Sequence, residues 1–457
     1  MFGKRSKNYE IDMCNGPLTG KILSFCAPLA LSGILQLLYN AADIIVVGRF
    51  TGPTALAAVG STGALINLIV NLLVGLSVGT SVVVAQNYGA GDLKGVHDTI
   101  HTSMLVSLIG GVLVGAIGVV FAHTFLGWMG SPYDVIDQAT LYLRIYFAGL
   151  PFNMAYNFSS AILRAMGDTK RPLLFLSIAG AVNVVLNLIF VIVFHMGVAG
   201  VALATIISQM ISSALMVICM MRSQGVFHFD PMQMRIHKEK LVQVVRVGLP
   251  AGLQGVIFSI SNVLIQSSIN SFGSTVIAGN AASSNLEGFM YTGMNSVYQA
   301  AMAFAGQNMG AKKYGRLHKV LGNCVGIVSA IGILMGAIVY LLRFPLLGIY
   351  TTDPGVVEYG IIRLELFCLT YFTCGAMDVL VGQMRGMGYS LVPMFVSIAG
   401  VCGLRVIWIL TVFRNVHTLF SLYVSYPVSW LVTGAVHFAC YLVLHKKIMQ
   451  RDDIVKD

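Results

Sequence analysis

The sequence has little charge for its length. Of its 457 residues only 10% are Asp, Glu, Lys or Arg, whereas 56% are hydrophobic and the mean hydropathy is +0.81. Soluble globular domains carry about 25% charged residues. So few charges over so much apolar surface exclude an ordinary soluble domain, and the composition indicates a membrane protein.

Other features are missing as well. The eight cysteines form no C-x-x-C pair, which argues against a metal site or a disulfide framework. No nucleotide-binding G-x-x-x-x-G-K-[ST] sequence and no H-E-x-x-H sequence occurs, so we expect neither ATP hydrolysis, nor an enzyme, nor a bound cofactor. The net charge of +10 comes from short loops rather than from a basic stripe interleaved with aromatic residues, which argues against nucleic acid as a partner.

Long apolar runs are abundant. A transmembrane helix needs about 20 mostly apolar residues, and in lipid its backbone groups must be satisfied within the segment, so such runs predict an all-α bundle. We count twelve runs, near residues 23–48, 58–86, 99–124, 139–164, 173–194, 198–221, 247–270, 277–305, 319–342, 361–385, 392–412 and 418–444.

The positive charges between these runs are unevenly distributed. With the N-terminus placed in the cytoplasm, five of the 28 lysines and arginines fall outside and Arg405 falls inside a run, which leaves 22 on the cytoplasmic side. The five outside are Arg49, Arg144, Arg343, Arg363 and Arg414. Because cytoplasmic loops are enriched in these residues, both termini are expected in the cytoplasm and the protein in the cell membrane.

The two halves of the sequence repeat each other. Gln-Asn-Tyr-Gly-Ala at 86–90 recurs as Gln-Asn-Met-Gly-Ala at 307–311, and Arg-Ala-Met-Gly at 164–167 recurs as Arg-Gly-Met-Gly at 385–388, both 221 residues later. Each offset spans six runs, an even number, so the halves enter the membrane in the same direction as parallel repeats. The sequence therefore predicts two six-helix bundles, 1–222 and 241–457, joined by a polar cytoplasmic linker at 223–240. Two such bundles are typical of transporters that work by alternating access.

Ionisable residues inside apolar runs are candidate functional sites, because each costs roughly 3 kcal/mol or more in hydrocarbon. Asp43 lies toward the outer third of the first run. Counting depth along the fifth and sixth runs brings Asn183, Asn187 and Thr205 to a similar level, and the two asparagines share a helix face at i, i+4. A carboxylate, two amide oxygens and a hydroxyl could hold a small cation such as Na⁺, or tune Asp43 for proton exchange.

Weaker candidates for substrate contact are polar residues in the same half. Side chains near Asp43 and an i, i+4 pair on the fourth run are candidates for ligand binding, although such residues more often serve as hydrogen bonders in helix packing. These are Gln36, Tyr39 and Asn40, and Asn153 and Asn157.

Four charges are buried in the C-terminal half. Glu287 on the eighth run is either a substrate-facing carboxylate or an interhelical hydrogen bonder. A lone arginine in the membrane is costly, so we expect Arg405 to pair with Glu365 or with Asp378, most simply as a structural pair that leaves the other acid for transport.

Taken together, these features resemble the multidrug and toxic compound extrusion (MATE) family. The Gln-Asn-x-Gly-Ala repeats, the stretch Gln-Leu-Leu-Tyr-Asn-Ala-Ala-Asp at 36–43 and the stretch Leu-Arg-Ala-Met-Gly-Asp at 163–168 are similar to that family's first helix and loops. The resemblance covers about residues 15–445. It implies a V-shaped antiporter, acting as a monomer, that expels organic cations and other amphipathic drugs in exchange for H⁺ or Na⁺.

The resemblance also implies a site. In the branch with its ion site in the N-terminal lobe, the first helix supplies an aspartate, the fifth an asparagine and a second aspartate, and the sixth a threonine. Asp43, Asn183 and Thr205 look like matches, whereas Asn187 is an amide where many members carry the second carboxylate. This departure leaves Asp43 as the single titratable group of the site.

Three alternatives remain open at this stage. A flippase for lipids or lipid-linked sugars is the nearest, although such relatives usually have about fourteen spans and a more cationic cavity. A membrane-embedded enzyme would need a catalytic constellation, and no metal-spaced histidines or usable nucleophile motif are present. A receptor or structural protein would not account for the two-lobe repeat.

Overall fold

The chain folds into helices. The computed structural model describes residues 10–223 and 225–450, and no strand occurs in that part of the chain. The helices of the first half are α1 (Leu18–Phe50), α2 (Pro53–Gly89), α3 (Leu93–Trp128), α4 (Ile136–Ala148), α5 (Leu150–Ala165), α6 (Lys170–Leu188), the π-helical η1 (Ile189–Val193) and α7 (Gly197–Met221), followed by the short 3₁₀-helix η2 (Pro231–Gln233).

The second half has a matching succession. Its elements are α8 (Lys238–Asn270), α9 (Ser274–Gly310), α10 (Tyr314–Leu341), α11 (Arg343–Gly348), α12 (Pro354–Gly386), α13 (Leu391–Ser397), the π-helical η3 (Ile398–Gly403), α14 (Leu404–Trp408), the π-helical η4 (Ile409–Phe413) and α15 (Leu419–Met449).

Each of the twelve apolar runs falls on one helix or on consecutive helices. Among the described residues, ten helical stretches are long and apolar enough to cross a membrane. The run at 139–164 is divided at Gly149, just before Pro151, into the shorter α4 and α5. The run at 277–305 lies in α9, which is long but carries many serines, asparagines and glycines.

The chain forms two compact units. The first comprises residues up to Ile66 together with Val83–Val244, and the second comprises Asn67–Val82 together with the residues from Val245 onward. The middle of α2 therefore belongs with the second unit. Its glycine at position 75 lies against α8, where a Cβ on Gly75 would be 2.2 Å from the backbone nitrogen of Gly252.

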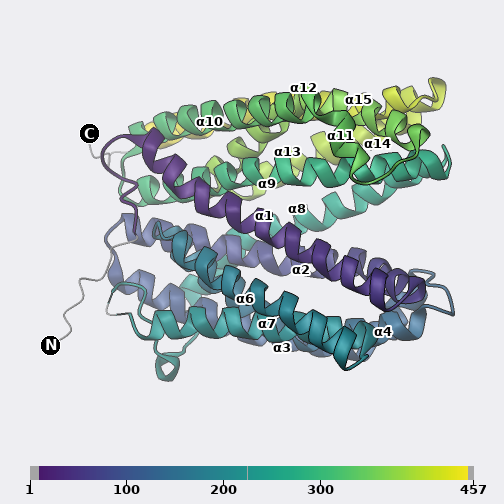
Figure 1. The fold of residues 1–457 in the computed structure, drawn as a ribbon. Helices are drawn as coiled ribbons and strands as arrows, with labels where there is room; N and C mark the ends of the chain where they lie inside the picture. Colours follow the sequence, from purple (N-terminus) through teal and green to yellow (C-terminus); the bar gives the residue numbers. More distant parts are fainter. Residues whose placement is uncertain (1–9, 224, 451–457) are drawn as a thin grey trace. The chain divides into compact units, whose positions relative to one another are not determined.

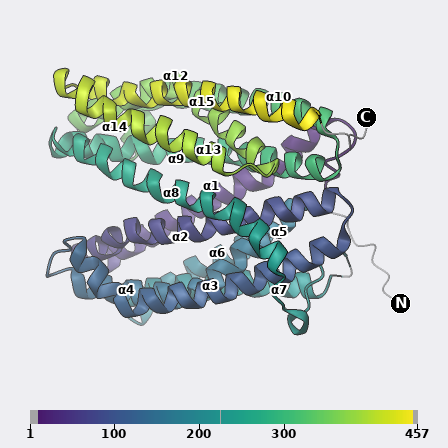
Figure 2. The same ribbon diagram turned by 180° about the vertical axis from the view of Figure 1, so that it is seen from behind.

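In the first unit, α6 packs against both α1 and α7, and α3 packs against α4 and α5 (Figures 1 and 2). Two glycines of α3 allow its backbone to approach its neighbours closely. A Cβ on Gly111 would lie 2.7 Å from Cα of Pro151, and one on Gly115 would lie 2.7 Å from the carbonyl oxygen of Phe147. Small residues spaced four apart are a common means of close helix packing in membranes.

The second unit repeats this packing. In it, α12 packs against α9, α10 and α15 (Figure 1). A Cβ on Gly332 of α10 would lie 2.8 Å from Cα of Phe372, and one on Gly336 would lie 2.3 Å from the carbonyl oxygen of Cys368. These four residues stand 221 positions after Gly111, Pro151, Gly115 and Phe147, so the repeat seen in the sequence is also a repeat of helix contacts.

The recurring Met-Gly sequences end helices. Gly167 has φ +95° and Gly388 has φ +90°, a conformation that glycine adopts without the steric cost of a Cβ. In the first turn the Asp168 N–H donates to the carbonyl of Leu163 and the Gly167 N–H to that of Arg164. This is the Schellman arrangement, which satisfies the last carbonyls of a helix.

The residues expected as a linker pack on the first unit. The Asp230 N–H donates to Nε2 of His101 on α3, and the His237 N–H donates to the Thr102 hydroxyl. The N–H of Met232 donates to the Asp230 carboxylate and holds the pKa of that carboxyl below its usual range. The compact first unit extends to Val244, beyond the linker expected at 223–240.

Replacing Gly111 by alanine is expected to destabilise the protein by about 1–3 kcal/mol, the usual cost of overpacking, because the new methyl group would meet backbone atoms of Pro151. The matched control is Gly110→Ala on the same helix, where nothing lies within 4 Å of an added Cβ. Thermal unfolding in detergent measures both. Equal melting temperatures for the two variants would contradict the packing described here.

Candidate functional site

Asp43 lies in a polar cluster built by three helices. The Asn187 side-chain Nδ2 donates a hydrogen bond to the Asp43 carboxylate, and it lies 3.2 Å from Oδ1 of Asn183. The Thr205 hydroxyl of α7 donates to the Val201 carbonyl at 3.0 Å and lines the same cavity as the Asp43 carboxylate. The structure thus brings together Asp43, Asn183, Asn187 and Thr205, the four residues that the sequence suggests as a coupling site.

The local helix geometry positions the two asparagines. Asn183 and Asn187 are four residues apart in α6, so both project from one face, and both are buried. The α-helix α6 ends at Leu188, and the chain continues directly into the π-helix η1. Single π-helical turns within helices occur frequently at functional sites.

A small cavity opens beside Asp43. It has a volume of about 90 Å³, and its walls come from α1, α6 and α7. Its polar lining consists of Gln36, Tyr39, Asn40, Asp43, Asn183, Thr205, Ser208, Gln209 and Ser212. Asn187 is fully buried, and its Oδ1 has no hydrogen-bond partner among the described residues. A space of this size suits a cation or a water molecule rather than a drug.

The ring of Tyr39 fits into this wall because Gly180, which faces it, has no side chain. A Cβ on Gly180 would lie 1.8 Å from the Tyr39 ring, so only glycine leaves room for the ring. The Tyr39 hydroxyl lies 3.4 Å from the carbonyl oxygen of Ser177. The tyrosine is therefore seated against α6, one turn before Asp43.

The other asparagine pair of the first unit lies elsewhere. The Asn157 side chain on α5 donates to both the backbone and side-chain oxygens of Asn153, each at 2.9 Å. Neither asparagine lines the Asp43 cavity. In the structure they serve each other as hydrogen-bond partners.

In the second unit, Glu287 is paired with an arginine that sequence reasoning placed outside the membrane. Arg363 Nε and a terminal nitrogen lie 2.6 and 2.7 Å from the two Glu287 carboxylate oxygens, and its other terminal nitrogen lies 2.5 Å from Asn280 Oδ1. Arg363 is buried in α12, within a helix long enough to span a membrane. Arg363 is the third residue of the apolar run expected at 361–385, and this position is the feature of the sequence that could have placed it within the membrane.

The expected pairing of Arg405 with Glu365 or Asp378 is wrong. Glu365 pairs with Arg343 at 3.2 Å, in a partly exposed contact at the start of α11. The Arg405 Nε donates to the Ser429 hydroxyl at 2.9 Å, and its guanidinium lies over the rings of Tyr426 and Trp430. Aromatic rings from α15 occupy the space that a carboxylate was expected to fill.

Asp378 on α12 lies on the side of the unit near Tyr291 and Arg385. Arg385 donates to the Tyr298 hydroxyl at 2.7 Å and to Gln254 Oε1 at 2.8 Å. These residues, together with Asp378, line a second cavity of about 170 Å³. Asp378 thus interacts electrostatically with Arg385, the residue that begins the repeated Arg-x-Met-Gly sequence.

Repeated helices long enough to cross a membrane, with ionisable groups buried in each unit, define a multi-span membrane protein. The sequence model of the MatE family matches residues 28–189 and again residues 250–411. The two matches begin 222 residues apart and together cover most of the chain. The chain belongs to the MatE family.

Relatives and solved structures agree with this membership. The chain is 26% identical over 432 residues to the probable multidrug resistance protein YoeA of Bacillus subtilis, covering 93% of each. It is 28% identical over 382 residues to the probable multidrug resistance protein YpnP of the same organism, covering 83% of this chain and 85% of that protein. Its fold matches an outward-facing multidrug resistance MATE family transporter of the MOP superfamily with a TM-score of 0.89, at 22% identity over 98% of this chain and 100% of that chain.

Breaking the buried Glu287–Arg363 pair on one side is expected to cost about 3–5 kcal/mol, because the remaining charge stays buried without compensation. Glu287→Gln and Arg363→Met should each lower the melting temperature in detergent, and the double variant should recover most of the loss. Glu365→Gln, at the partly exposed pair, serves as the control and should cost about 1 kcal/mol or less. A double variant as unstable as the sum of the two single variants would contradict this account.

Proposed function

We propose that the protein is a secondary active multidrug efflux transporter, which exports amphipathic and often cationic organic compounds in exchange for H⁺ or Na⁺. The names of its relatives support the substrate class, since YoeA and YpnP are both named probable multidrug resistance proteins. The observation that carries the coupling is the Asp43 cluster, where one carboxylate meets a buried amide whose oxygen lacks a partner.

The donor set favours a proton. Asp43 is the one carboxylate lining its cavity, and Asn187 presents an amino group to it, as a charged carboxylate requires. When Asp43 is protonated it becomes a donor. A half-turn of the Asn187 amide then presents the unpartnered Oδ1 as the acceptor. Protonation thus changes the hydrogen bonds that join α1 to α6.

Such a change is sufficient for exchange. A cation and a drug are coupled when each binds preferentially to a different conformation of the transporter. In the outward-facing state the proton binds at Asp43 and favours a conformation with lower drug affinity, so the drug leaves. The protein then reorients, releases the proton inside and binds the next drug molecule.

This function implies the remaining expectations. The two repeated halves act as lobes, residues 1–222 and 241–457, that alternate access about the linker at 223–240. Both termini lie in the cytoplasm, the protein resides in the cell membrane, and a single chain suffices as the working unit. The lipid bilayer, drugs and the coupling ion are its partners.

The first experiment is ethidium efflux from proteoliposomes, driven separately by an imposed proton gradient and an imposed sodium gradient. We expect efflux with the proton gradient, and we expect Asp43→Asn to abolish it while the variant remains folded and inserted. Efflux driven by the sodium gradient alone would show that the coupling ion is Na⁺ and not H⁺. Normal efflux by Asp43→Asn would remove Asp43 from the mechanism, and no efflux under either gradient would favour a lipid flippase.

A second carboxylate at position 187 should convert the site. Asn187→Asp adds a negative charge and hard oxygen ligands beside Asp43, which is the chemistry that a small metal cation requires. We expect this variant to gain thermal stability in NaCl relative to choline chloride, whereas the wild type does not. The double variant Asp43→Asn/Asn187→Asp is the control and should lose the gain, while a gain that survives in it would place the sodium elsewhere.

A further inference from the structure

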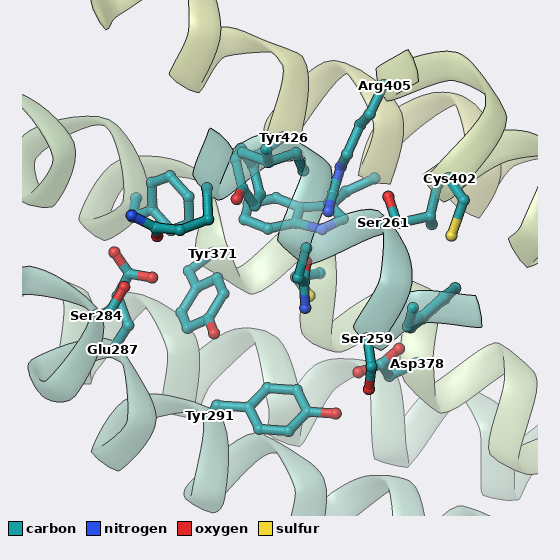
Figure 3. Close-up of a pocket in the computed structure, with 18 of the residues that line it drawn as sticks. Ser259, Ser261, Ser284, Glu287, Tyr291, Tyr371, Asp378, Cys402, Arg405 and Tyr426 are labelled. Carbon is teal, nitrogen blue, oxygen red and sulfur yellow. The ribbon is translucent and has the colours of Figure 1, made fainter. Parts of the chain in front are cut away.

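The second unit contains a pocket much larger than the Asp43 cavity. Its volume is about 610 Å³, within the range of sites for drug-sized ligands. Aromatic residues line much of it, including Phe258, Tyr291, Phe367, Tyr371, Tyr426 and Trp430. Figure 3 shows Arg405 extending from its helix toward the ring of Tyr426, with Glu287 and Asp378 placed on other helices around the pocket.

The charges that line the pocket are not all paired with one another. Four ionisable acids and bases line it, namely Glu287, Asp378, Arg363 and Arg405. Glu287 and Arg363 neutralise each other through two hydrogen bonds. Asp378 has the charge of Arg385 nearby, in the adjoining cavity. Of the two guanidinium groups that line the pocket, Arg405 is therefore the one that forms no ion pair with a carboxylate among the described residues.

Arg405 is buried in the wall of the pocket, but the wall does not provide acceptors for all of its N–H donors. The residue is only 5% exposed. Of its five N–H donors, one is accounted for by the Ser429 hydroxyl, and its face is covered by the Tyr426 ring at 4.1 Å and the Trp430 ring at 5.8 Å. No carboxylate of the described residues forms an ion pair with it. The edge of the guanidinium therefore faces the pocket with its charge uncompensated.

The internal repeat relates the large pocket to the Asp43 site. The two matches to the MatE family begin 222 residues apart, and Asp43, near the start of the first match, corresponds at that offset to Ile265. Ile265 also lines the large pocket. Arg405 lies on α14 between the π-helical segments η3 and η4, as the asparagines of α6 precede η1. At the position of Asp43 the second unit thus has an apolar side chain, and the charges of its pocket come from other positions.

We propose that the large pocket binds the anionic group of an aromatic organic compound, with a carboxylate on the open edge of Arg405 and the ring system against the aromatic lining. A guanidinium edge matches a carboxylate with two parallel hydrogen bonds, which a cation or a neutral group cannot make. This inference rests on the proposed function, since it names a second substrate class for the same transporter.

The test measures binding without transport. Radiolabelled 2-naphthoate and its neutral amide, 2-naphthamide, are bound to purified protein in detergent by equilibrium dialysis. We expect the wild type to bind the carboxylate roughly tenfold or more tightly than the amide, as for hydrogen bonds to a charged group. Arg405→Met should remove this preference while changing the affinity for the amide by less than about twofold, because its apolar contacts remain.

Two further variants keep the test decisive. Arg405→Lys preserves the charge but not the paired donors, and it should retain only part of the preference. Arg343→Met, at the partly exposed pair with Glu365, is the matched control and should leave both affinities unchanged. The proposal would be overturned if the wild type bound the carboxylate no more tightly than the amide. It would also be overturned if Arg405→Met and Arg405→Lys each weakened the binding of 2-naphthoate and of 2-naphthamide by the same factor.

The outcome is separable from that of the proposed function. Asp43→Asn is expected to lose gradient-driven ethidium efflux and to keep the Arg405-dependent preference for 2-naphthoate. If the wild type binds 2-naphthoate through Arg405 but exports nothing under either gradient, the binding proposal stands and the transport proposal fails. If the wild type exports ethidium but shows no preference for the carboxylate, the transport proposal stands and the binding proposal fails.

Discussion

Every charge placed among the membrane helices of this protein must be compensated by its neighbours, and the arrangement of each unit follows from that requirement. Hydrocarbon does not solvate a charge, so neighbouring side chains must take over that role. Glu287 and Arg363 meet with two hydrogen bonds, Asp43 meets an amide, and Arg405 meets two rings. The groups whose compensation is incomplete are the ones available to a ligand or an ion.

The two halves share a scaffold but not a site. The close approaches of Gly111 and Gly115 recur as those of Gly332 and Gly336, and the turns at Gly167 and Gly388 have the same backbone conformation. These positions are set by helix packing, which an insertion of any side chain would disturb. The charged groups do not follow the repeat in the same way, since Asp43 in the first half corresponds to the apolar Ile265 in the second.

The sequence predicts the helices and the Asp43 cluster well, because both depend on periodicity and on depth along a span. Asn183 and Asn187 share a face in any α-helix, and counting from the ends of the runs brings Asp43 to their level. The partners of Arg363, Glu365 and Arg405 could not be found in this way. Arg363 stands at the edge of an apolar run, where a loop and a helix look alike, and the rings beside Arg405 come from α15, whose rotation against α14 is fixed by side-chain packing alone.

The middle of α2 belongs to a different compact unit from its two ends. Residues Asn67–Val82 cluster with the second unit, where Gly75 meets the backbone of α8 at Gly252. A cut in the linker would therefore not yield two self-sufficient pieces, since the C-terminal fragment would lack this segment and expose the glycine surface that receives it. The second unit therefore depends on a segment of the N-terminal half for its complete set of packed helices.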